Sequence, residues 1–250
     1  MVRLKEAERL IAEHSHLTVM DGPFRGMRYV ESAFHSGYAT KLLGSYEAEL
    51  HPFIEEVIQR AKGGKYSGLI DIGAAEGYYA IGLARCCPTL GVVAFEMDET
   101  AVTLCLELAR RNEVEARVEV RGTCDIAALR EALQGFGGPA FVLCDVEGDE
   151  IKLLDPTLIP ELQRCDLLVE LHDFSNSLIT PTLLQRFQET HDITHFNTQV
   201  RRPHDVPAAA FLPAYLRPVA VDDMRAFHQS FLWLSARSDA VLTSSPTPPG

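Results

Sequence analysis

From position 66 onward, the apolar residues form short continuous runs, and amphipathic segments separate these runs. Continuous apolar runs of about four to eight residues are typical of strands that are buried on both faces. Because strand-like and helix-like segments alternate five times, the pattern predicts an α/β fold with a parallel, doubly wound sheet. The predicted strands are GLIDIG (68–73), GVVAFEM (91–97), RVEVRG (117–122), AFVLCDV (140–146), DLLVELHD (166–173), DITHFNTQ (192–199) and SFLWLSA (230–236).

The segments between these strands have the features of helices. Asp98 fits an N-cap, Gly135 a helix end and Pro181 a first helical turn. The predicted helices are residues 76–87, 98–112, 125–133 and 180–191, with one further helical segment before residue 166 that Pro156 and Pro160 interrupt.

The first 65 residues follow a different pattern. Residues 3–14 and 45–61 are expected to be amphipathic helices, and residues 22–30 two short extended pieces around a turn. Gly63-Gly64 ends the second helix. We therefore expect an N-terminal helical extension or lid (1–65), a sheet domain (66–237) and a flexible tail rich in Ser, Thr and Pro (238–250).

Composition and charge narrow the functional classes. The 250 residues are 46% hydrophobic and 23% charged, which is typical of soluble globular proteins. No apolar stretch approaches the roughly 20 residues of a membrane helix, and the N-terminus lacks a signal-peptide core. The formal charge of −12 disfavours general nucleic-acid binding. Six cysteines without a C-x-x-C pair indicate buried thiols in a reducing compartment, so we expect a cytoplasmic protein. The charge and the lack of a long apolar stretch predict neither a nucleic-acid nor a membrane partner.

Acidic residues follow five of the predicted strands. In open α/β sheets, ligands bind at the carboxyl ends of the strands, so these residues are candidates for a site. An acid before a helix can also serve only as its cap, and this alternative stays open for Asp98 and Asp125. The strand-end segments are Asp71-Ile-Gly73, Glu96, Cys124-Asp125, Asp145-Val-Glu147-Gly148 and Glu170-Leu-His172-Asp173.

The loop after the first strand distinguishes between cofactors. It contains Gly73 and Gly77 but lacks the middle glycine of G-x-G-x-x-G, where a pyrophosphate approaches the backbone. Ala75 stands near that place, and Glu76 is expected to repel a diphosphate. Glu96, about 25 positions on, can accept hydrogen bonds from both ribose hydroxyls. An adenosine cofactor with a cationic sulfonium and no phosphate, S-adenosylmethionine, fits this pattern.

Residues 66–175 resemble a class I S-adenosylmethionine-dependent methyltransferase. The segments that carry the resemblance are DIGAAEGYYAIGLAR, VVAFEMDETAVTLCLELARRN, and AFVLCDVEGDEIKLL followed by DLLVELHD. Within that superfamily, the Asp145–Gly148 box resembles the FkbM type, whose members mostly methylate hydroxyl oxygens. The resemblance implies a seven-stranded, mostly parallel sheet with an antiparallel last strand. Ala75 and Met97 depart from the glycine and proline that are usual in the superfamily.

The resemblance also implies roles for individual residues. Asp71, Gly73 and Gly77 would form the cofactor turn, Glu96 would bind the ribose, and Asp125, with Cys124 beside it, would bind the adenine amino group. The predicted cofactor-binding residues are Asp71, Gly73, Ala74, Glu76, Gly77, Tyr78, Glu96, Met97, Cys124, Asp125 and Asp145.

The candidate catalytic residues are His172, Asp145 and Glu170. His172 can act as a general base, because Glu170 lies two residues away on the same strand face and can orient the imidazole. A divalent cation held by Asp145, Glu147, Glu170 and His172 is the alternative, and Mg²⁺ or Mn²⁺ would suit these ligands.

Two further features have both a functional and a structural interpretation. Tyr46 and Tyr78 could place ring faces beside a sulfonium, or could simply pack in the core. Arg201-Arg202 could bind an anionic acceptor, or could balance the acidic rim.

These observations favour an S-adenosylmethionine-dependent methyltransferase that acts on a hydroxyl of a small molecule or natural-product intermediate. Two rivals remain at this point: an NAD-linked oxidoreductase on the same fold, and a non-catalytic accessory subunit that binds the cofactor. The sequence leaves open the acceptor, methylation on oxygen or nitrogen, and the oligomeric state.

Overall fold

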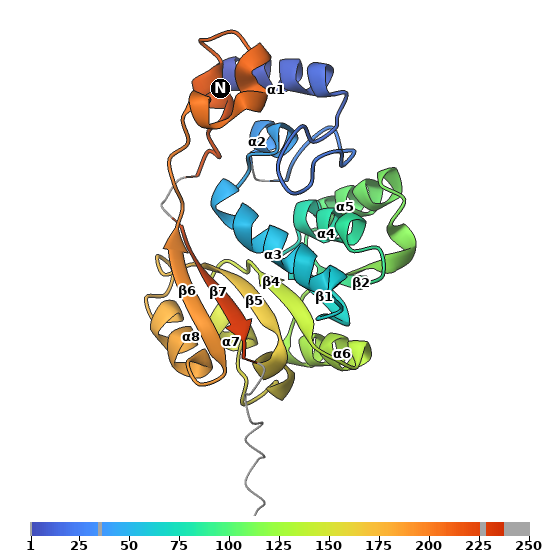
Figure 1. The fold of residues 1–250 in the computed structure, drawn as a ribbon, viewed down its shortest axis with the longest axis vertical. Helices are drawn as coiled ribbons and strands as arrows, with labels where there is room; N and C mark the ends of the chain where they lie inside the picture. Colours follow the sequence, from blue (N-terminus) through green and yellow to red (C-terminus); the bar gives the residue numbers. More distant parts are fainter. Residues whose placement is uncertain (1, 35–36, 226–228, 238–250) are drawn as a thin grey trace, which may run out of the picture.

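The computed structural model describes residues 2–34, 37–225 and 229–237, and its centre is a seven-stranded sheet (Figure 1). The strand order is β3-β2-β1-β4-β5-β7-β6, and β7 runs antiparallel to both of its neighbours. The predicted α/β class and the mostly parallel sheet are therefore confirmed. The strands are β1 (Gly68–Ile72), β2 (Gly91–Phe95), β3 (Val118–Arg121), β4 (Ala140–Cys144), β5 (Asp166–Leu171), β6 (His191–Asn197) and β7 (Ser230–Ala236).

Helices cover both faces of the sheet. Strands β1, β4 and β5 are buried along their whole length, which explains their continuous apolar sequences. Two separate apolar clusters, one on each face, fill the space between the sheet and the helices. On one face lie α3 (His51–Lys62), α4 (Tyr78–Cys86) and α5 (Glu99–Arg111), and on the other α6 (Ile126–Phe136), α7 (Glu150–Leu153) and α8 (Ile179–Phe187).

The helix ends follow the local chemistry of the chain. The Asp98 carboxylate accepts hydrogen bonds from the first-turn amides of Thr100 and Ala101, as an N-cap does. Helix α6 continues past Gly135, where we predicted its end, and stops before Gly137, which has a left-handed φ of 69°. A C-terminal glycine in this conformation closes a helix without steric cost.

The N-terminal extension differs in part from its prediction. Helix α1 (Val2–Ser15) is present, but residues 45–61 do not form one helix. Helix α2 (Tyr38–Leu43) ends at Gly44, which has a φ of 76°, and a 3-10 turn, η1 (Ala48–Leu50), precedes α3. Residues 22–30 do not form the two predicted extended pieces. The structure has instead one isolated β-bridge in this region, between Thr18 and Arg28.

The connection between β6 and β7 packs against α1, an arrangement the sequence pattern did not indicate (Figure 1). It contains η4 (Pro203–Asp205), η5 (Pro207–Phe211) and α9 (Arg217–Ala220). The rings of His14 and Phe211 stack with centroids 3.8 Å apart, and the Tyr215 hydroxyl donates a 2.8 Å hydrogen bond to Glu6. We call residues 2–34, 37–47 and 203–221 together the cap.

Three smaller predictions concern the chain as a whole. All six cysteines are free thiols, as expected. Within the described ranges, none of the helices has the length and apolar character needed to cross a membrane. The predicted flexible tail, residues 238–250, lies outside the described residues.

Candidate active site

A cavity of about 650 Å³ lies where the parallel strands end. It sits at the point where strand order reverses, between β1 and β4, which is where open α/β sheets bind their ligands. Residues of η1 and of the cap form its other wall. The lining residues include Lys41, Tyr46, Glu47, Asp71, Gly73, Ala74, Ala75, Tyr78, Tyr79, Glu96, Met97, Cys124, Asp145, Glu147, Glu170 and Arg225.

The glycine-containing turn lies directly after β1. Gly73 has a φ of 83°, and a Cβ atom there would lie 1.8 Å from the carbonyl oxygen of Asp145, so only glycine fits. Gly77, with a φ of 89°, begins α4, and its Cβ would meet Cys105 Sγ at 2.7 Å. Gly73, Ala74 and Tyr78 line the cavity, whereas Gly77 lies behind the wall. The turn thus brings bare backbone to the cavity surface.

Glu96 presents a fixed carboxylate at the end of β2. One of its oxygens accepts a 2.8 Å hydrogen bond from the amide of Ala75, and the other accepts a 2.8 Å bond from the amide of Asp98. Glu96 is half-buried and lines the cavity beside the exposed Met97. Two carboxylate oxygens held in this way keep lone pairs available for two adjacent ligand hydroxyls.

Asp71 is a buried carboxylate on β1. Its Oδ2 accepts a 2.9 Å hydrogen bond from the amide of Ala80 in the first turn of α4, whereas Oδ1 has no hydrogen-bond partner among the described residues. Burial, together with the nearby charges of Asp145 and Glu96, raises the pKa of Asp71 to about 7. An unpaired buried oxygen at a cavity wall fits a site that is completed by a polar ligand.

The residues after β3 have two different roles: some line the cavity, and Asp125 caps a helix. Cys124 lines the cavity together with Gly122 and Thr123. Asp125 is exposed, and its Oδ1 accepts a 2.8 Å hydrogen bond from the amide of Ala128 as the N-cap of α6. The capping interpretation therefore describes Asp125 in this structure, and its side chain is not part of the cavity wall.

Glu76 is fully buried beneath the turn, away from the cavity wall. Its carboxylate binds the ammonium of Lys41 and the hydroxyl of Tyr29, and accepts a 3.2 Å hydrogen bond from the amide of Phe34. Burial raises the pKa of Glu76, but the ion pair with Lys41 outweighs this effect and leaves the pKa lowered. Because Glu76 is paired and lies away from the cavity wall, the structure does not support the expectation that it repels a diphosphate.

The fold brings together His172 and the acids after β4 and β5. His172 Nε2 lies 3.5 Å from Asp145, 3.4 Å from Glu147 and 4.0 Å from Glu170. Its Nδ1 lies 2.5 Å from Glu150, a fully buried residue that the sequence interpretation missed. The acids Asp145, Glu147 and Glu170 line the cavity, whereas the imidazole lies behind them.

The charges in this acid–histidine cluster perturb one another. Burial raises the pKa of Asp145 to about 6, with His172 acting in the opposite direction. Burial and the neighbouring carboxylates raise the pKa of Glu170, and Arg225 lies 2.8 Å from it. Burial lowers the pKa of His172, but the hydrogen bond with Glu150 and the surrounding acids outweigh burial and raise it.

The β6–β7 connection and the extension supply two cavity side chains that the sequence did not single out, Arg225 and Lys41. Arg225 binds Glu170 on β5 and Glu47 before η1, and so joins the two walls of the cavity. Tyr46 and Tyr78 both line the cavity, with their rings edge to face at 5.6 Å. Lys41 Nζ lies 4.7 Å from the Tyr46 centroid. Lys41 stands in the six-residue helix α2 and Arg225 outside any helix or strand, so periodicity gives no signal for either.

Arg201 does not lie at the cavity wall. It forms buried ion pairs with Glu49, at 2.9 Å, and with Asp223. In this structure Arg201 therefore fastens the β6–β7 connection to η1.

Comparisons with known proteins support the fold. Neither the family models nor the curated protein sequences give a match to this chain. The N-terminal domain of human METTL16 in complex with SAH shares 13% identity over 92% of this chain and 80% of that chain, with a TM-score of 0.51. The human methyltransferase 10 domain containing protein shares 12% identity over 93% and 96%, with a TM-score of 0.50. An O-methyltransferase from Bacillus cereus in complex with SAH shares 14% identity over 94% and 91%, with a TM-score of 0.45. The chain has the Rossmann-like methyltransferase fold.

Proposed function

We propose that this protein is an S-adenosylmethionine-dependent methyltransferase that transfers a methyl group to a hydroxyl oxygen of a small molecule. The observation that carries the proposal is the Glu96 carboxylate, which two backbone amides hold at the wall of a cavity beside a glycine turn. The fold that this chain shares with methyltransferases supports the same assignment. The likeness of the Asp145–Gly148 box to FkbM-type enzymes supports oxygen as the methylated atom.

The residues present fit the methyl donor. Glu96 would accept hydrogen bonds from the ribose hydroxyls, and the bare backbone at Gly73 would lie against the donor. Oδ1 of Asp71, which lacks a hydrogen-bond partner in the part of the chain that the structure describes, offers a further acceptor, and the acidic wall favours a cation. Gly122, Thr123 and Cys124 would bound the adenine end, in place of the Asp125 carboxylate.

The chemistry follows from what the cavity residues can do. When bound, S-adenosylmethionine supplies the methyl carbon, so that a carbon–oxygen bond forms while the carbon–sulfur bond breaks and sulfur keeps its electron pair. Positioning of the acceptor supplies much of the rate in such an in-line displacement. The acceptor proton must also leave, and the carboxylates of Asp145 and Glu170 at the cavity wall are placed to receive it. His172 lies behind these acids and does not line the cavity, so it is not placed to receive the proton itself.

The cap completes the acceptor side of the cavity in this proposal. Tyr46 and Glu47 of the cap line the part of the wall that the sheet does not supply, together with Arg225 from the chain between the cap and β7. We propose that they shape the acceptor site and exclude water from the reacting centre.

Calorimetric titration of the purified protein with S-adenosylmethionine, S-adenosylhomocysteine (SAH) and NAD tests the donor site. We expect saturable binding of the two sulfur compounds and no binding of NAD. Glu96→Ala removes two hydrogen bonds to a charged acceptor, so it should weaken SAH binding about a hundredfold.

Glu99→Ala is the matched control, because Glu99 is an exposed acid in the first turn of α5 and does not line the cavity. It should bind SAH like the unchanged protein. Binding of NAD alone, or equal SAH affinity in Glu96→Ala and Glu99→Ala, would contradict the proposal.

A further inference from the structure

Three ligand-bearing side chains converge between the ends of β4 and β5. Asp145 and Glu147 belong to the loop after β4, and His172 directly follows β5. One oxygen of each acid and one ring nitrogen of His172 all lie within 4.8 Å of one another. Ligand atoms that share one ion at about 2.0–2.2 Å stand roughly 2.8–3.6 Å apart at octahedral or tetrahedral angles. The distances of 3.4 Å and 3.5 Å from His172 Nε2 to the two carboxylates fall within this range.

Glu150, which contacts the ring nitrogen opposite the two acids, orients the imidazole of His172 toward them. His172 is fully buried, and its Nδ1 lies 2.5 Å from Oε1 of the equally buried Glu150. A carboxylate accepts, so the proton of the ring stands on Nδ1 and the Nε2 lone pair faces Asp145 and Glu147. A carboxylate that fixes a histidine through its second nitrogen is the usual support of a metal-binding imidazole.

Among the three converging side chains, two buried atoms lack hydrogen-bond partners within the described residues, and so does Oε2 of the supporting Glu150. The two atoms of the converging side chains are His172 Nε2 and Asp145 Oδ1, and they lie 3.5 Å apart. A lone pair and a carboxylate oxygen that face each other in a buried site repel unless a positive charge lies between them. That charge is either a second proton on the ring or a cation.

The backbone explains how Glu147 joins the cluster. Strand β4 ends at Cys144, so strand alternation does not govern Glu147. Glu147 has a left-handed φ of 53°, and Gly148, with a φ of 116°, follows it. Glu170, which the sequence had grouped with the other possible ligands, pairs instead with Arg225.

We infer that Asp145, Glu147 and His172 Nε2 bind one divalent cation, with Glu150 as the supporting partner of the imidazole. Two carboxylate oxygens and one imidazole nitrogen favour Mn²⁺ over Mg²⁺, which prefers oxygen ligands alone. Because Asp145 and Glu147 line the cavity, the free coordination positions of the cation face it. The site therefore takes an acceptor with two neighbouring oxygens, and this last step alone rests on the proposed methyl transfer.

Mn²⁺ titration of the full chain, first stripped with a chelator and followed by electron paramagnetic resonance, tests the site without any methyl donor. We expect one Mn²⁺ per chain, with a spin-echo modulation from a single imidazole nitrogen. Glu147→Gln should weaken Mn²⁺ binding at least tenfold, and His172→Gln should abolish the nitrogen signal.

Glu147 suits this test because its side chain is 80% exposed, so its replacement leaves the fold intact. Glu113→Gln is the matched control: Glu113 is also an exposed glutamate with a left-handed φ, of 59°, and is expected to leave Mn²⁺ binding unchanged. Loss of affinity in Glu150→Gln by about 10- to 100-fold would support the orienting role of that residue.

No Mn²⁺ binding, or Mn²⁺ binding that neither variant alters, would overturn the cation site and assign the positive charge to a proton on His172. SAH titration of the same stripped protein separates this outcome from failure of the proposed function. SAH that binds to a protein without Mn²⁺ affinity removes the cation and leaves the methyl donor in place.

Discussion

Single residues at the cavity carry local costs in stability. Asp71 is a buried carboxylate with one oxygen that no described residue hydrogen-bonds, and Ala75 has a left-handed backbone with a φ of 48°. Neither feature stabilises the fold. Such costs concentrate at sites where a ligand is bound.

Replacing Asp71 with Asn should stabilise the protein at alkaline pH. The pKa of about 7 lies above the ordinary value of 3.8, so the folded state holds the proton more tightly than the unfolded state. The free energy of unfolding therefore falls as the pH rises from about 4 to about 7, by at most about 4 kcal/mol. Asn keeps an acceptor for the amide of Ala80 but does not ionise. We expect Asp71→Asn to exceed the unchanged protein by about 2 kcal/mol at pH 8 in urea unfolding.

The two proteins should have similar stability at pH 4, where Asp71 is protonated. Asp192→Asn, at an exposed position on β6, serves as the control and should follow the unchanged protein. An Asp71→Asn variant whose stability varies with pH as steeply as that of the unchanged protein would refute the explanation. The same variant should bind SAH more weakly.

Ala75→Gly should stabilise the turn after β1. An L-residue in the left-handed region is sterically strained, and glycine relieves that strain. We expect the free energy of unfolding to rise by about 1 kcal/mol in a urea titration. Ala127→Gly, at an exposed position in the first turn of α6, is the control and should not raise it, because Ala127 has no left-handed strain to relieve. A loss of stability in both variants would contradict the assignment of strain to Ala75.

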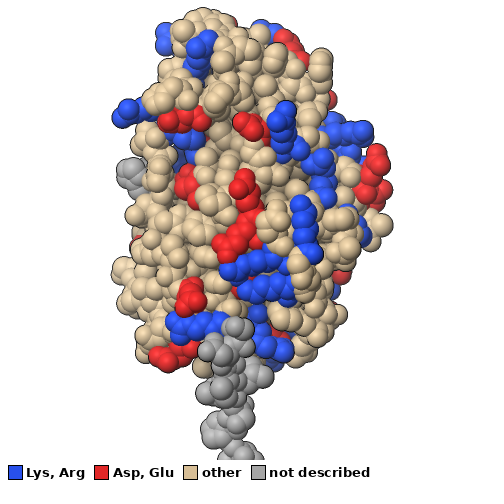
Figure 2. All heavy atoms as spheres, in the orientation of Figure 1, with Lys and Arg blue, Asp and Glu red and all other residues tan. Residues whose placement is uncertain are grey.

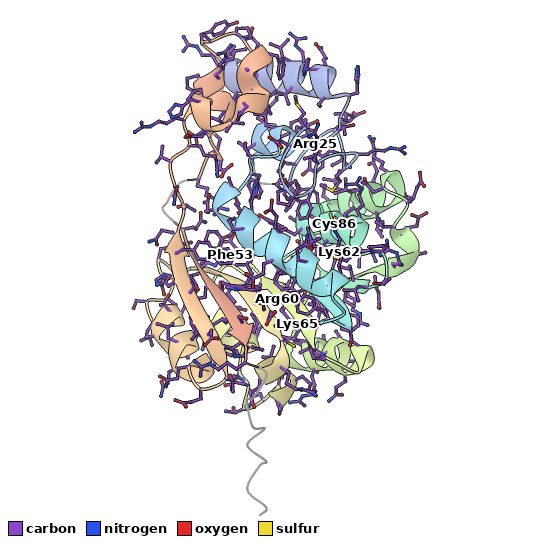
Figure 3. All side chains as sticks on the ribbon, in the orientation of Figure 1. Arg25, Phe53, Arg60, Lys62, Lys65 and Cys86 are labelled. Carbon is purple, nitrogen blue, oxygen red and sulfur yellow. The ribbon has the colours of Figure 1, made fainter. Side chains whose placement is uncertain are left out.

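At the scale of elements, one buried acid of the sheet, Asp166, binds the end of α3. Asp166, the first residue of β5, accepts hydrogen bonds from Arg60 at 2.7 Å, Lys65 at 2.9 Å and the amide of Ala236 at 2.8 Å. Figures 2 and 3 show basic side chains gathered on this face, where Arg60, Lys62 and Lys65 lie near the end of α3. Phe53, labelled in the same view, stacks on Phe196 at 4.5 Å between ring centroids.

Asp166→Asn should loosen this attachment. Burial raises the pKa of Asp166, but its hydrogen bonds to Lys65 and Tyr66 outweigh burial and leave the pKa below its ordinary value. The carboxylate therefore contributes stability above about pH 4, and this contribution is lost as the pH falls below that value. We expect a loss of about 2 kcal/mol at pH 7 in urea unfolding, with a smaller difference at pH 3.

Asp192→Asn again provides the comparison, since Asp192 pairs with Arg237 at a largely exposed site. A loss in Asp166→Asn that stays constant down to pH 3 would show that the charge is not the cause.

Periodicity predicted the elements that pack against the sheet, because burial on a regular strand or helix leaves a regular pattern. It failed for α2 and α9, which have six and four residues and too few turns to show a period. At the site, strand ends pointed to Glu96, Asp145 and His172. The direction of Glu76 was not predictable, because the left-handed residues Ala75 and Gly77 on either side of it reverse the chain. Glu150 gave no signal, since it reads as an ordinary acid at the start of a helix.

At the scale of the whole molecule, the cap is built from two distant parts of the chain. Helix α1 shares an apolar cluster with the β6–β7 connection, and Ile11, Leu212 and Leu216 belong to it. Ion pairs of Arg201 and Arg225 fasten the same connection to η1 and to β5. The cap should therefore loosen as one unit.

Ile11→Ala tests this unity. Ile11 is fully buried in α1, so its truncation should cost about 3 kcal/mol. We expect faster amide hydrogen exchange both in residues 2–15 and in residues 203–221, while the strands keep their protection. Leu129→Ala, a core truncation in α6 on the opposite face of the sheet, should leave the exchange of residues 203–221 unchanged. Faster exchange confined to α1 would show that the cap is not one unit.

The divided origin of the cap has a consequence for how proteins with such a cap diversify. The N-terminal segment and the β6–β7 connection each leave an apolar face open without the other, so neither can be exchanged on its own. A ligand preference that depends on this cap would pass between relatives only when both segments change together. A chimera that receives only one of the two segments from a relative should misassemble. A chimera that receives both segments should also take on the ligand preference of that relative.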